Sequence, residues 1–184
     1  MFDLKHLADF VTFARSLLAF GLIWLGWSQG MRALGLAVYL ILVDWTGDVL
    51  DGALARRSQH KHRTWIGIHD LEVDITVSAG LLGYMILSGF VDWQIGAVYL
   101  VSWGVIFSLW GYSRSLGMLV QAPTYLWFIY IAIREPPHQG WWLIAWIAMI
   151  LIITWPRFPN QVIPDFLENM RKIMREHSTN INDT

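Results

Sequence analysis

The feature that most constrains this chain is a long apolar run that holds almost no charge. Between Ile75 and Ile133 the only Asp, Glu, Lys or Arg residues are Asp92 and Arg114. Over the whole chain 55% of residues are hydrophobic and only 15% are charged, too few to cover the surface of a water-soluble domain. Runs of this kind are typical of helices that cross a bilayer. The sequence therefore predicts an all-α, polytopic membrane protein.

Apolar segments of suitable length occur six times. Each is close to the roughly 20 residues that a helix needs to cross the hydrocarbon core, and short polar connectors separate them. We therefore expect one transmembrane domain over residues 1–184, with six spanning helices and short interfacial helices. The expected spans are Leu7–Trp27, Leu34–Ala55, Asp70–Phe90, Gln94–Tyr112, Gly117–Ile133 and Gly140–Trp155.

The basic residues predict the orientation of these spans. Cytoplasmic segments of membrane proteins are enriched in Lys and Arg. With both termini in the cytoplasm, the outer loops hold only Arg32 and Arg134, and all other basic residues lie inside. Those inner residues are Lys5, Arg15, Arg56, Arg57, Lys61, Arg63, Arg114, Arg157, Arg171, Lys172 and Arg175. The sequence thus predicts a protein of the inner cell membrane with cytoplasmic termini.

The C-terminal segment has a different pattern. Over residues 165–177 apolar side chains recur at helical spacing among Arg171, Lys172 and Arg175. This pattern suits a helix on the surface of an anionic inner leaflet, and a soluble tail is the alternative reading. Residues 178–184 are polar and are expected to be disordered. The net charge of −1 gives no argument for a nucleic-acid partner, and the absence of Cys excludes disulfides and thiolate metal ligands.

Five aspartates lie where a membrane helix should be apolar. Asp44, Asp48 and Asp51 fall in the second span, and Asp70 and Asp74 begin the third. Charges in such positions are costly and need a partner or a function. At 100° per residue the first three share a sector of about 60° on one helix face. The two helices are antiparallel and joined by a short basic loop, so the sequence predicts a carboxylate cluster at the cytoplasmic end.

A cluster of carboxylates repels itself unless cations neutralise it. Carboxylate oxygens select hard divalent ions such as Mg²⁺ or Mn²⁺. Two such ions held by shared carboxylates suit in-line displacement at phosphorus. The alternative is that one or two of the aspartates cap helices or form hydrogen bonds inside the bundle. Gly52 beside Asp51 leaves room for a ligand, and Arg56 belongs to a basic rim suited to phosphate.

The same segment resembles the CDP-alcohol phosphatidyltransferase family. That family has the pattern D-x2-D-G-x2-A-R, then eight or nine residues, then G-x3-D-x3-D. Here the first half reads Asp48-Val-Leu-Asp51-Gly52-Ala-Leu-Ala55-Arg56, and the second half ends Asp70-Leu-Glu-Val-Asp74. One fixed position differs, because Ile66 stands where the family has Gly and Gly67 follows one residue later. This difference puts the substrate, and to a lesser degree the activity, in question.

The resemblance implies the roles of individual residues. Asp48, Asp51 and Asp70 would hold two Mg²⁺ or Mn²⁺ ions on the diphosphate of a CDP-linked lipid. Asp74 would be the catalytic base that takes the proton of the acceptor hydroxyl, and it would also touch a metal ion. The residues that would line the nucleotide and donor site are Gly52, Ala55 and Arg56. The products would be a phospholipid and CMP, which makes the chain an enzyme of phospholipid synthesis.

Further residues are candidates for the two substrates. The first span contains Asp9-Phe-Val-Thr12-Phe-Ala-Arg15, which is similar to a pattern near the start of that family. Thr12 and Arg15 share a helix face and are expected to contact the nucleotide, although Arg15 also suits a contact with lipid headgroups. Arg114 is the candidate for a phosphate on the acceptor. Asp44 is expected either to touch the acceptor hydroxyls or to form hydrogen bonds in the interior.

The acceptor itself is not specified by these residues. Glycerol phosphate and inositol phosphate are the leading candidates because they are common acceptors in the family. The family resemblance also implies a homodimer. Two other functions use similar carboxylates: a Mg²⁺-dependent intramembrane prenyltransferase and a divalent-cation transporter. The first would release pyrophosphate in place of CMP, and the second would need a polar path across the membrane. A family member without activity is a third reading, suggested by Ile66.

Overall fold

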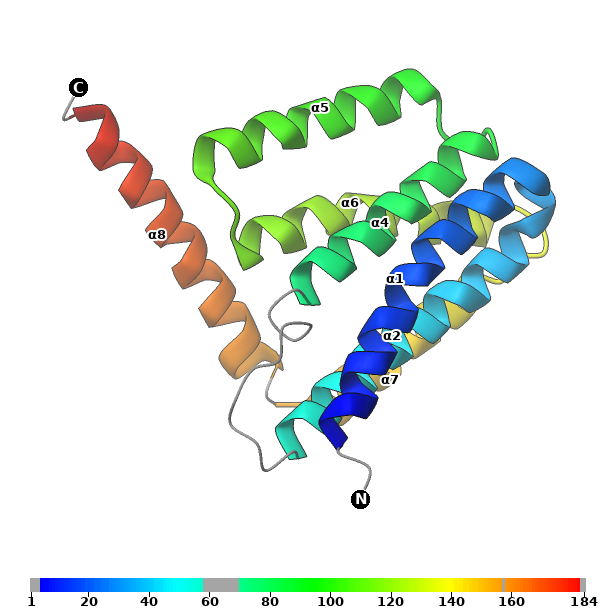
Figure 1. The fold of residues 1–184 in the computed structure, drawn as a ribbon, viewed down its shortest axis with the longest axis horizontal. Helices are drawn as coiled ribbons and strands as arrows, with labels where there is room; N and C mark the ends of the chain where they lie inside the picture. Colours follow the sequence, from blue (N-terminus) through cyan, green and yellow to red (C-terminus); the bar gives the residue numbers. More distant parts are fainter. Residues whose placement is uncertain (1–3, 58–69, 157, 183–184) are drawn as a thin grey trace.

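A computed structural model of the chain describes residues 4–57, 70–156 and 158–182, and all regular elements in this part are helices (Figure 1). Some of these residues are described by their backbone alone, among them Asp51, Gly52, Ala55, Arg56 and Asp70. The helices, labelled as in Figure 1, are α1 (Leu4–Ser28), η1 (Gly30–Ala33), α2 (Leu34–Arg57), α4 (Asp70–Leu87), α5 (Trp93–Trp110), α6 (Arg114–Arg134), α7 (Gly140–Thr154), η2 (Phe158–Val162) and α8 (Ile163–Asn182).

Each of the six predicted segments coincides with a helix to within a few residues, which confirms the all-α fold. Local capping explains where α5 and α6 begin. The Asp92 side chain accepts a hydrogen bond from the Gln94 backbone N–H, and the Ser113 hydroxyl accepts one from Leu116. Such caps satisfy backbone donors that a helix N-terminus leaves without partners. Both charges of the long apolar run, Asp92 and Arg114, therefore lie at helix ends.

Four helical segments of the described chain are long and apolar enough to cross a membrane: Phe10–Ser28, Gly30–Leu50, Trp93–Trp110 and Arg114–Arg134. A fifth is present if α7 and the bent segment after it form one span. α4 carries Asp70, Glu72 and Asp74 in its first five residues, and α7 has only 15 residues. These helices are compatible with an integral membrane protein. The number of six spans and the cytoplasmic position of both termini stay predictions.

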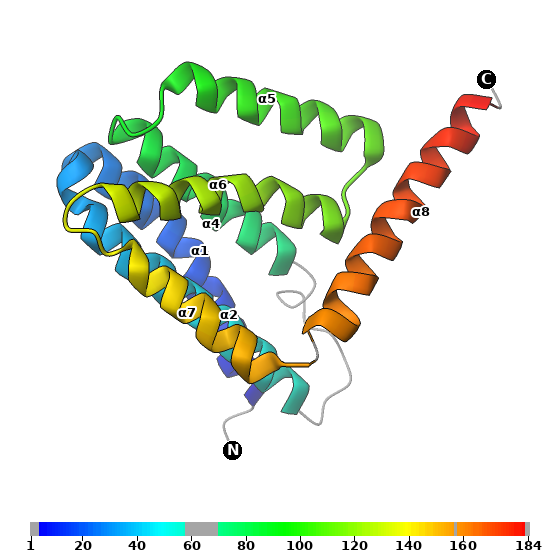
Figure 2. The same ribbon diagram turned by 180° about the vertical axis from the view of Figure 1, so that it is seen from behind.

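The core of the bundle lies between α1, α2, α4 and α6. α1 packs most extensively against α4 and then against α2, while α6 packs against α4 and α7. Figure 2 shows α6 and α7 on the opposite side of the bundle from α1. Leu22, Ile41, Leu81 and Phe128 are fully buried where these helices meet. By contrast, α5 lies at the edge of the bundle, and its apolar side chains are largely exposed, as suits a helix that faces lipid.

α1 and α4 approach each other closely because a small residue lies at their crossing. A β-carbon added to Gly80 of α4 would lie 2.6 Å from the Cα of Ala19 on α1. Close backbone approach at small residues is the usual way in which membrane helices associate, since lipid provides no hydrophobic driving force between them. This contact fixes α4 against α1, and it therefore also sets the distance between the polar residues at the ends of these two helices.

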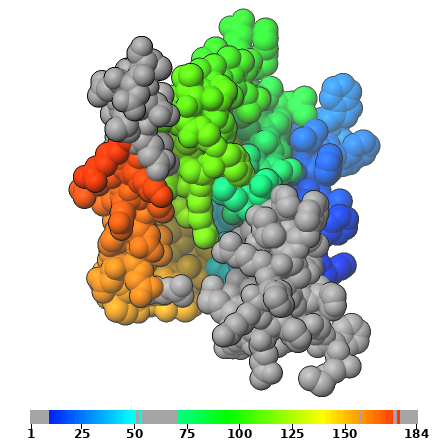
Figure 3. Space-filling model, turned by 60° about the vertical axis from the view of Figure 1, so that its left-hand side comes forward, coloured from blue at the N-terminus to red at the C-terminus, as the bar shows by residue number. Residues whose placement is uncertain are grey.

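α8 leaves the direction of the bundle. The segment Phe158–Lys172 is bent by 82° from α7, and Figure 3 shows α8 on the surface of the molecule. Arg171, Lys172 and Arg175 are exposed on this helix. The helix is longer than the predicted surface segment 165–177, because it begins at Ile163 and continues to Asn182, into the region expected to be disordered. If α7 crosses the membrane, a helix at this angle to it would lie along the membrane surface.

The crossing of α1 and α4 yields a prediction about two glycines. Gly80→Ala places a methyl group against the α1 backbone, and overpacking of this kind typically costs about 1–3 kcal/mol. Gly104 of α5 has no atom within 4 Å of an added β-carbon, so Gly104→Ala is the matched control. Thermal unfolding in detergent should show a lower midpoint for Gly80→Ala and no loss for Gly104→Ala. Equal midpoints for the two variants would contradict so close a crossing of α1 and α4.

Candidate functional site

Arg15 is the centre of the most polar part of the described bundle. Its side chain is 5% exposed, and it forms ion pairs with three aspartates from two other helices. Arg15 Nε donates to Asp44 Oδ1 at 2.9 Å and Nη1 donates to Asp48 Oδ1 at 3.0 Å. Nη2 donates to Asp74 Oδ1 at 2.5 Å. One guanidinium group thus joins α1, α2 and α4.

The positions of these residues along their helices explain the convergence. Asp44 and Asp48 are one turn apart on α2, so both point toward α1. Asp74 is one turn into α4, which also packs against α1. Gly47 of α2 makes room for the arginine, because a β-carbon there would lie 3.2 Å from Arg15 Cδ and 3.4 Å from Arg15 Cγ. The guanidinium can therefore lie between the two acidic helices.

The three acids differ in their exposure. The side chain of Asp44 is 2% exposed, that of Asp74 is 26% exposed and that of Asp48 is 46% exposed. The cluster therefore runs from a fully buried ion pair to a carboxylate that solvent and a ligand can reach. Among the described side chains, one guanidinium is shared by three carboxylates. The two more exposed acids, Asp48 and Asp74, supply oxygens that can also bind a further cation.

Tyr112 extends the site toward the start of α6. It lies in the connection between α5 and α6. Burial, and then the negative charges of Glu72 and Asp74, raise the pKa of Tyr112 to about 12. The phenol therefore stays protonated at neutral pH and can donate a hydrogen bond. Nothing in the sequence pattern pointed to this residue, because Tyr112 is distant from the aspartates along the chain and its proximity depends on the packing of α6 beside α4.

The structure describes four further predicted site residues to different extents. Thr12 is buried on α1, about one turn before Arg15. Arg114 is exposed and is the first residue of α6, two residues after Tyr112. Asp51 lies on α2 beyond Asp48, and Asp70 is the first residue of α4, one turn before Asp74. The side chains of Asp51 and Asp70 lie outside the described part of the chain.

The remaining predictions fall at the edge of the described structure or beyond it. Gly52, Ala55 and Arg56 continue the last turns of α2, and only their backbone is described. Ile66 and Gly67, which bear on the one departure from the family pattern, lie outside the described residues. The described geometry of the site comes from α1, which carries Arg15, and from the two helices that carry the halves of the pattern.

Arg15 and Asp44 have contacts that the sequence left open. Arg15 was expected at the nucleotide or at lipid headgroups, and in the structure it points into the aspartate cluster. Asp44 was expected at the acceptor or in an interior hydrogen bond, and in the structure it is buried against Arg15. A signal for this pairing was present, because an acid and a base buried within membrane helices each need a partner.

The described residues provide part of a metal-binding donor set. Asp48 and Asp74 supply carboxylate oxygens, which are hard ligands that fit Mg²⁺ or Mn²⁺. Their Oδ1 atoms lie close enough to share one guanidinium group. In the chain as far as it is described, no three acidic or histidine side chains are arranged to hold one metal ion. Further ligands at this site would have to come from side chains such as Asp51 and Asp70.

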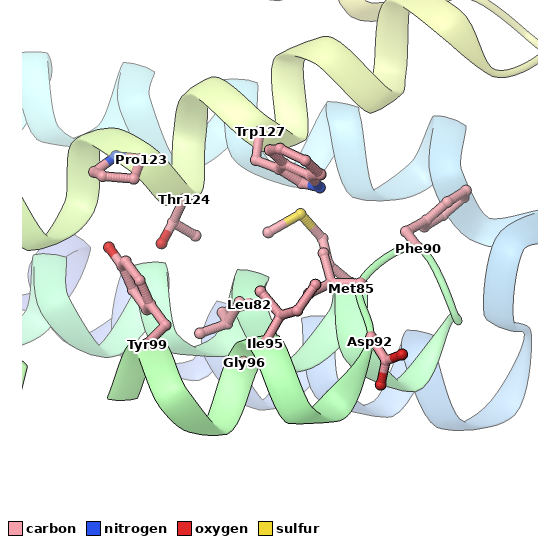
Figure 4. Close-up of a pocket in the computed structure, with 11 residues that line it drawn as sticks. Leu82, Met85, Phe90, Asp92, Ile95, Gly96, Tyr99, Pro123, Thr124 and Trp127 are labelled. Carbon is pink, nitrogen blue, oxygen red and sulfur yellow. The ribbon is translucent and has the colours of Figure 1, made fainter. Parts of the chain in front are cut away.

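A cavity of about 190 Å³ lies away from the aspartates, between α4, α5 and α6 (Figure 4). Its wall is almost entirely apolar, and two of its polar side chains have structural roles. Asp92 caps α5, and the Tyr99 hydroxyl donates a hydrogen bond to the Val120 carbonyl. The cavity brings no set of acids, bases or nucleophiles together, so the Arg15 cluster is the better candidate for chemistry.

Comparison of the chain with models of known protein families, with curated proteins and with solved structures gives no match. The geometry of the cluster and the sequence pattern therefore carry the functional interpretation.

The ion pairs predict how single and double substitutions affect stability. Arg15→Gln removes the guanidinium that pairs with the buried Asp44 carboxylate, and the loss of one partner of a buried pair typically costs about 3–5 kcal/mol. Asp44→Asn should also destabilise the fold, because it removes one of the anions around Arg15. The double variant Arg15→Gln/Asp44→Asn should recover much of the loss, which unfolding of all three variants in detergent would measure. Strictly additive losses would contradict a direct Arg15–Asp44 pair.

Proposed function

We propose that this protein is a metal-dependent phosphatidyltransferase of the CDP-alcohol type, with six spanning helices, cytoplasmic termini and its site at the cytoplasmic face of the inner cell membrane. It transfers a phosphatidyl group from a CDP-linked lipid such as CDP-diacylglycerol to a small alcohol and releases CMP. The observation that carries this proposal is that Asp48 and Asp74 both bind the guanidinium group of Arg15. These residues are the first and last acids of a pattern whose halves lie on separate helices.

The chemistry of such a transfer requires two different functions from carboxylates. Divalent ions would neutralise the diphosphate of the donor and the CMP leaving group, and Asp48, Asp51, Asp70 and Asp74 are the residues that would hold them. A carboxylate must also accept the proton of the attacking hydroxyl. Asp74 suits this second function because it is partly exposed and lies one helical turn beyond Asp70.

The reaction then follows from these assignments. The acceptor hydroxyl gives its proton to the Asp74 carboxylate while its oxygen forms a bond to the phosphorus nearer the lipid. The bond between that phosphorus and the oxygen of CMP breaks, and the electron pair leaves with CMP. Gly52, Ala55, Arg56 and Thr12 are proposed to line the nucleotide and donor site. The acyl chains of the donor stay in the bilayer, which explains a nucleotide site at a membrane face.

The acceptor is proposed to bind between Asp74 and the start of α6. The Asp74 charge contributes to the raised pKa of Tyr112, and the protonated phenol can donate a hydrogen bond to an acceptor hydroxyl. Arg114 is exposed two residues later and can pair with a phosphate group on the acceptor. These two side chains favour a phosphorylated polyol such as glycerol phosphate or inositol phosphate. A homodimer stays part of the proposal on the family resemblance alone.

The described residues give less support to the alternative hypothesis that the protein transports divalent cations. A transported ion would need polar groups along its path to the opposite membrane face. Beyond the Arg15 cluster, the places where α1, α4 and α6 meet are filled by fully buried Leu22, Leu81 and Phe128. Among the described residues, the buried charged side chains are Arg15 and Asp44, both in the cluster, which suits a site that serves one membrane face.

The proposed activity can be assayed with purified protein in detergent or nanodiscs. CDP-diacylglycerol, Mg²⁺ and a panel of alcohols that includes glycerol phosphate and inositol phosphate should yield CMP with at least one acceptor. Chelation of the metal should abolish the release, because the diphosphate loses its counter-ions. Release of pyrophosphate from a prenyl diphosphate, with no CMP from any CDP-lipid, would instead favour the prenyltransferase alternative.

A substitution at Asp74 tests its role as base. Asp74→Asn should lower transfer at least about a hundredfold, because general-base catalysis contributes roughly 10²–10⁴-fold, while binding of the donor largely survives. Glu72→Gln is the matched control, since Glu72 is exposed two residues earlier on α4. Initial rates and donor affinity of both variants give the comparison. Wild-type activity in Asp74→Asn would remove Asp74 as the base.

A further inference from the structure

Arg15 occupies the position at which the pattern predicts a metal ion. Two acids of the proposed metal set, Asp48 and Asp74, bind its two terminal nitrogens, Nη1 and Nη2. The third nitrogen, Nε, binds Asp44, an acid outside the pattern. A guanidinium and a divalent ion both bind carboxylate oxygens, and two cations bound to the same carboxylates repel each other. The two cations therefore compete for Asp48 and Asp74.

Asp44 has the geometry of an anchor for Arg15. The side chain of Asp44 is 2% exposed and that of Arg15 is 5% exposed, so this pair lies in the interior of the bundle. Asp48 and Asp74 are more exposed, with 46% and 26% of their side chains accessible. A ligand can reach the exposed acids without separating the buried pair. The pair between Arg15 and Asp44 can thus persist while the other two contacts are exchanged.

We propose that Arg15 is an internal counter-ion of the metal site, held in place by Asp44. In the protein without metal, Arg15 keeps Asp48 and Asp74 close together and limits their mutual repulsion. When a divalent ion binds, Asp48 and Asp74 exchange their contacts with Arg15 for contacts with the ion, and Asp44 retains the guanidinium. This inference rests on the proposed metal-dependent function. It makes Arg15 a positioning residue and gives Asp44 a function other than acceptor binding.

The affinity for divalent ions distinguishes a competing arginine from a purely structural one. Removal of a competing cation should strengthen the binding of a divalent ion, even if the fold becomes less stable. The single variant Arg15→Gln also removes the guanidinium that pairs with the buried Asp44 carboxylate, and it can fail to fold. The double variant Arg15→Gln/Asp44→Asn avoids this problem, because it removes one positive and one negative charge together and leaves the local net charge unchanged.

Binding of Mn²⁺, followed by electron paramagnetic resonance of the free ion in neutral-lipid nanodiscs, tests the inference. The double variant should bind Mn²⁺ at least about fivefold more tightly than wild type, within the usual range of coupling between two sites. Asp44→Asn alone should bind it more weakly, because the guanidinium loses its buried ionic partner and is held more strongly by Asp48 and Asp74. Arg171→Gln, which removes an exposed charge on α8, is the control and should match wild type.

Three results would overturn the inference. Equal or weaker Mn²⁺ binding by the double variant would show that Arg15 does not compete with the ion, and the proposed transferase would stand without this feature. A gain as large in Arg171→Gln, which lies on α8 outside the cluster, would show that the gain is not specific to Arg15 and would overturn the inference. If wild type and all variants bind no Mn²⁺, then the proposed metal-dependent function fails together with the inference.

Discussion

The polar site of this bundle depends on one arginine that is shared by three aspartates. Charges within membrane helices are costly, and a buried charge without a partner is more costly still. Arg15 is an ionic partner of Asp44, Asp48 and Asp74 at once, and it thereby links α1 to both acidic helices. The packing of small residues complements this link. Gly80 lets α4 approach α1, and Gly47 leaves space for the arginine side chain.

The positions of the helices could be predicted from the sequence because each one follows an apolar run of suitable length. The helix ends were less certain, since caps such as Asp92 and Ser113 shift a boundary by a few residues. The number of spans could not be settled in the same way. α4 begins with three acids and α7 is short, so their length and composition alone do not establish that they cross the membrane.

The candidate site was predictable in its location and less so in its contacts. Helical spacing placed Asp44, Asp48 and Asp74 at neighbouring helix ends, and the structure brings these three together. The identity of their shared partner was not predictable, because it depends on the direction in which the Arg15 side chain points across the α1 interface. Tyr112 was missed for a related reason. Its distance from Asp74 is set by how α6 packs beside α4, where Gly117 lies against Leu71.

The most direct measurement is the anomalous scattering of Mn²⁺ in crystals of the protein grown with a CDP-lipid analogue. If the carboxylates of α2 and α4 form a metal site, a Mn²⁺ peak should lie within about 2.0–2.6 Å of oxygens from both Asp48 and Asp74, beside the diphosphate. Absence of a peak there, with Arg15 still joined to both acids while the analogue is bound, would contradict a metal-dependent transferase.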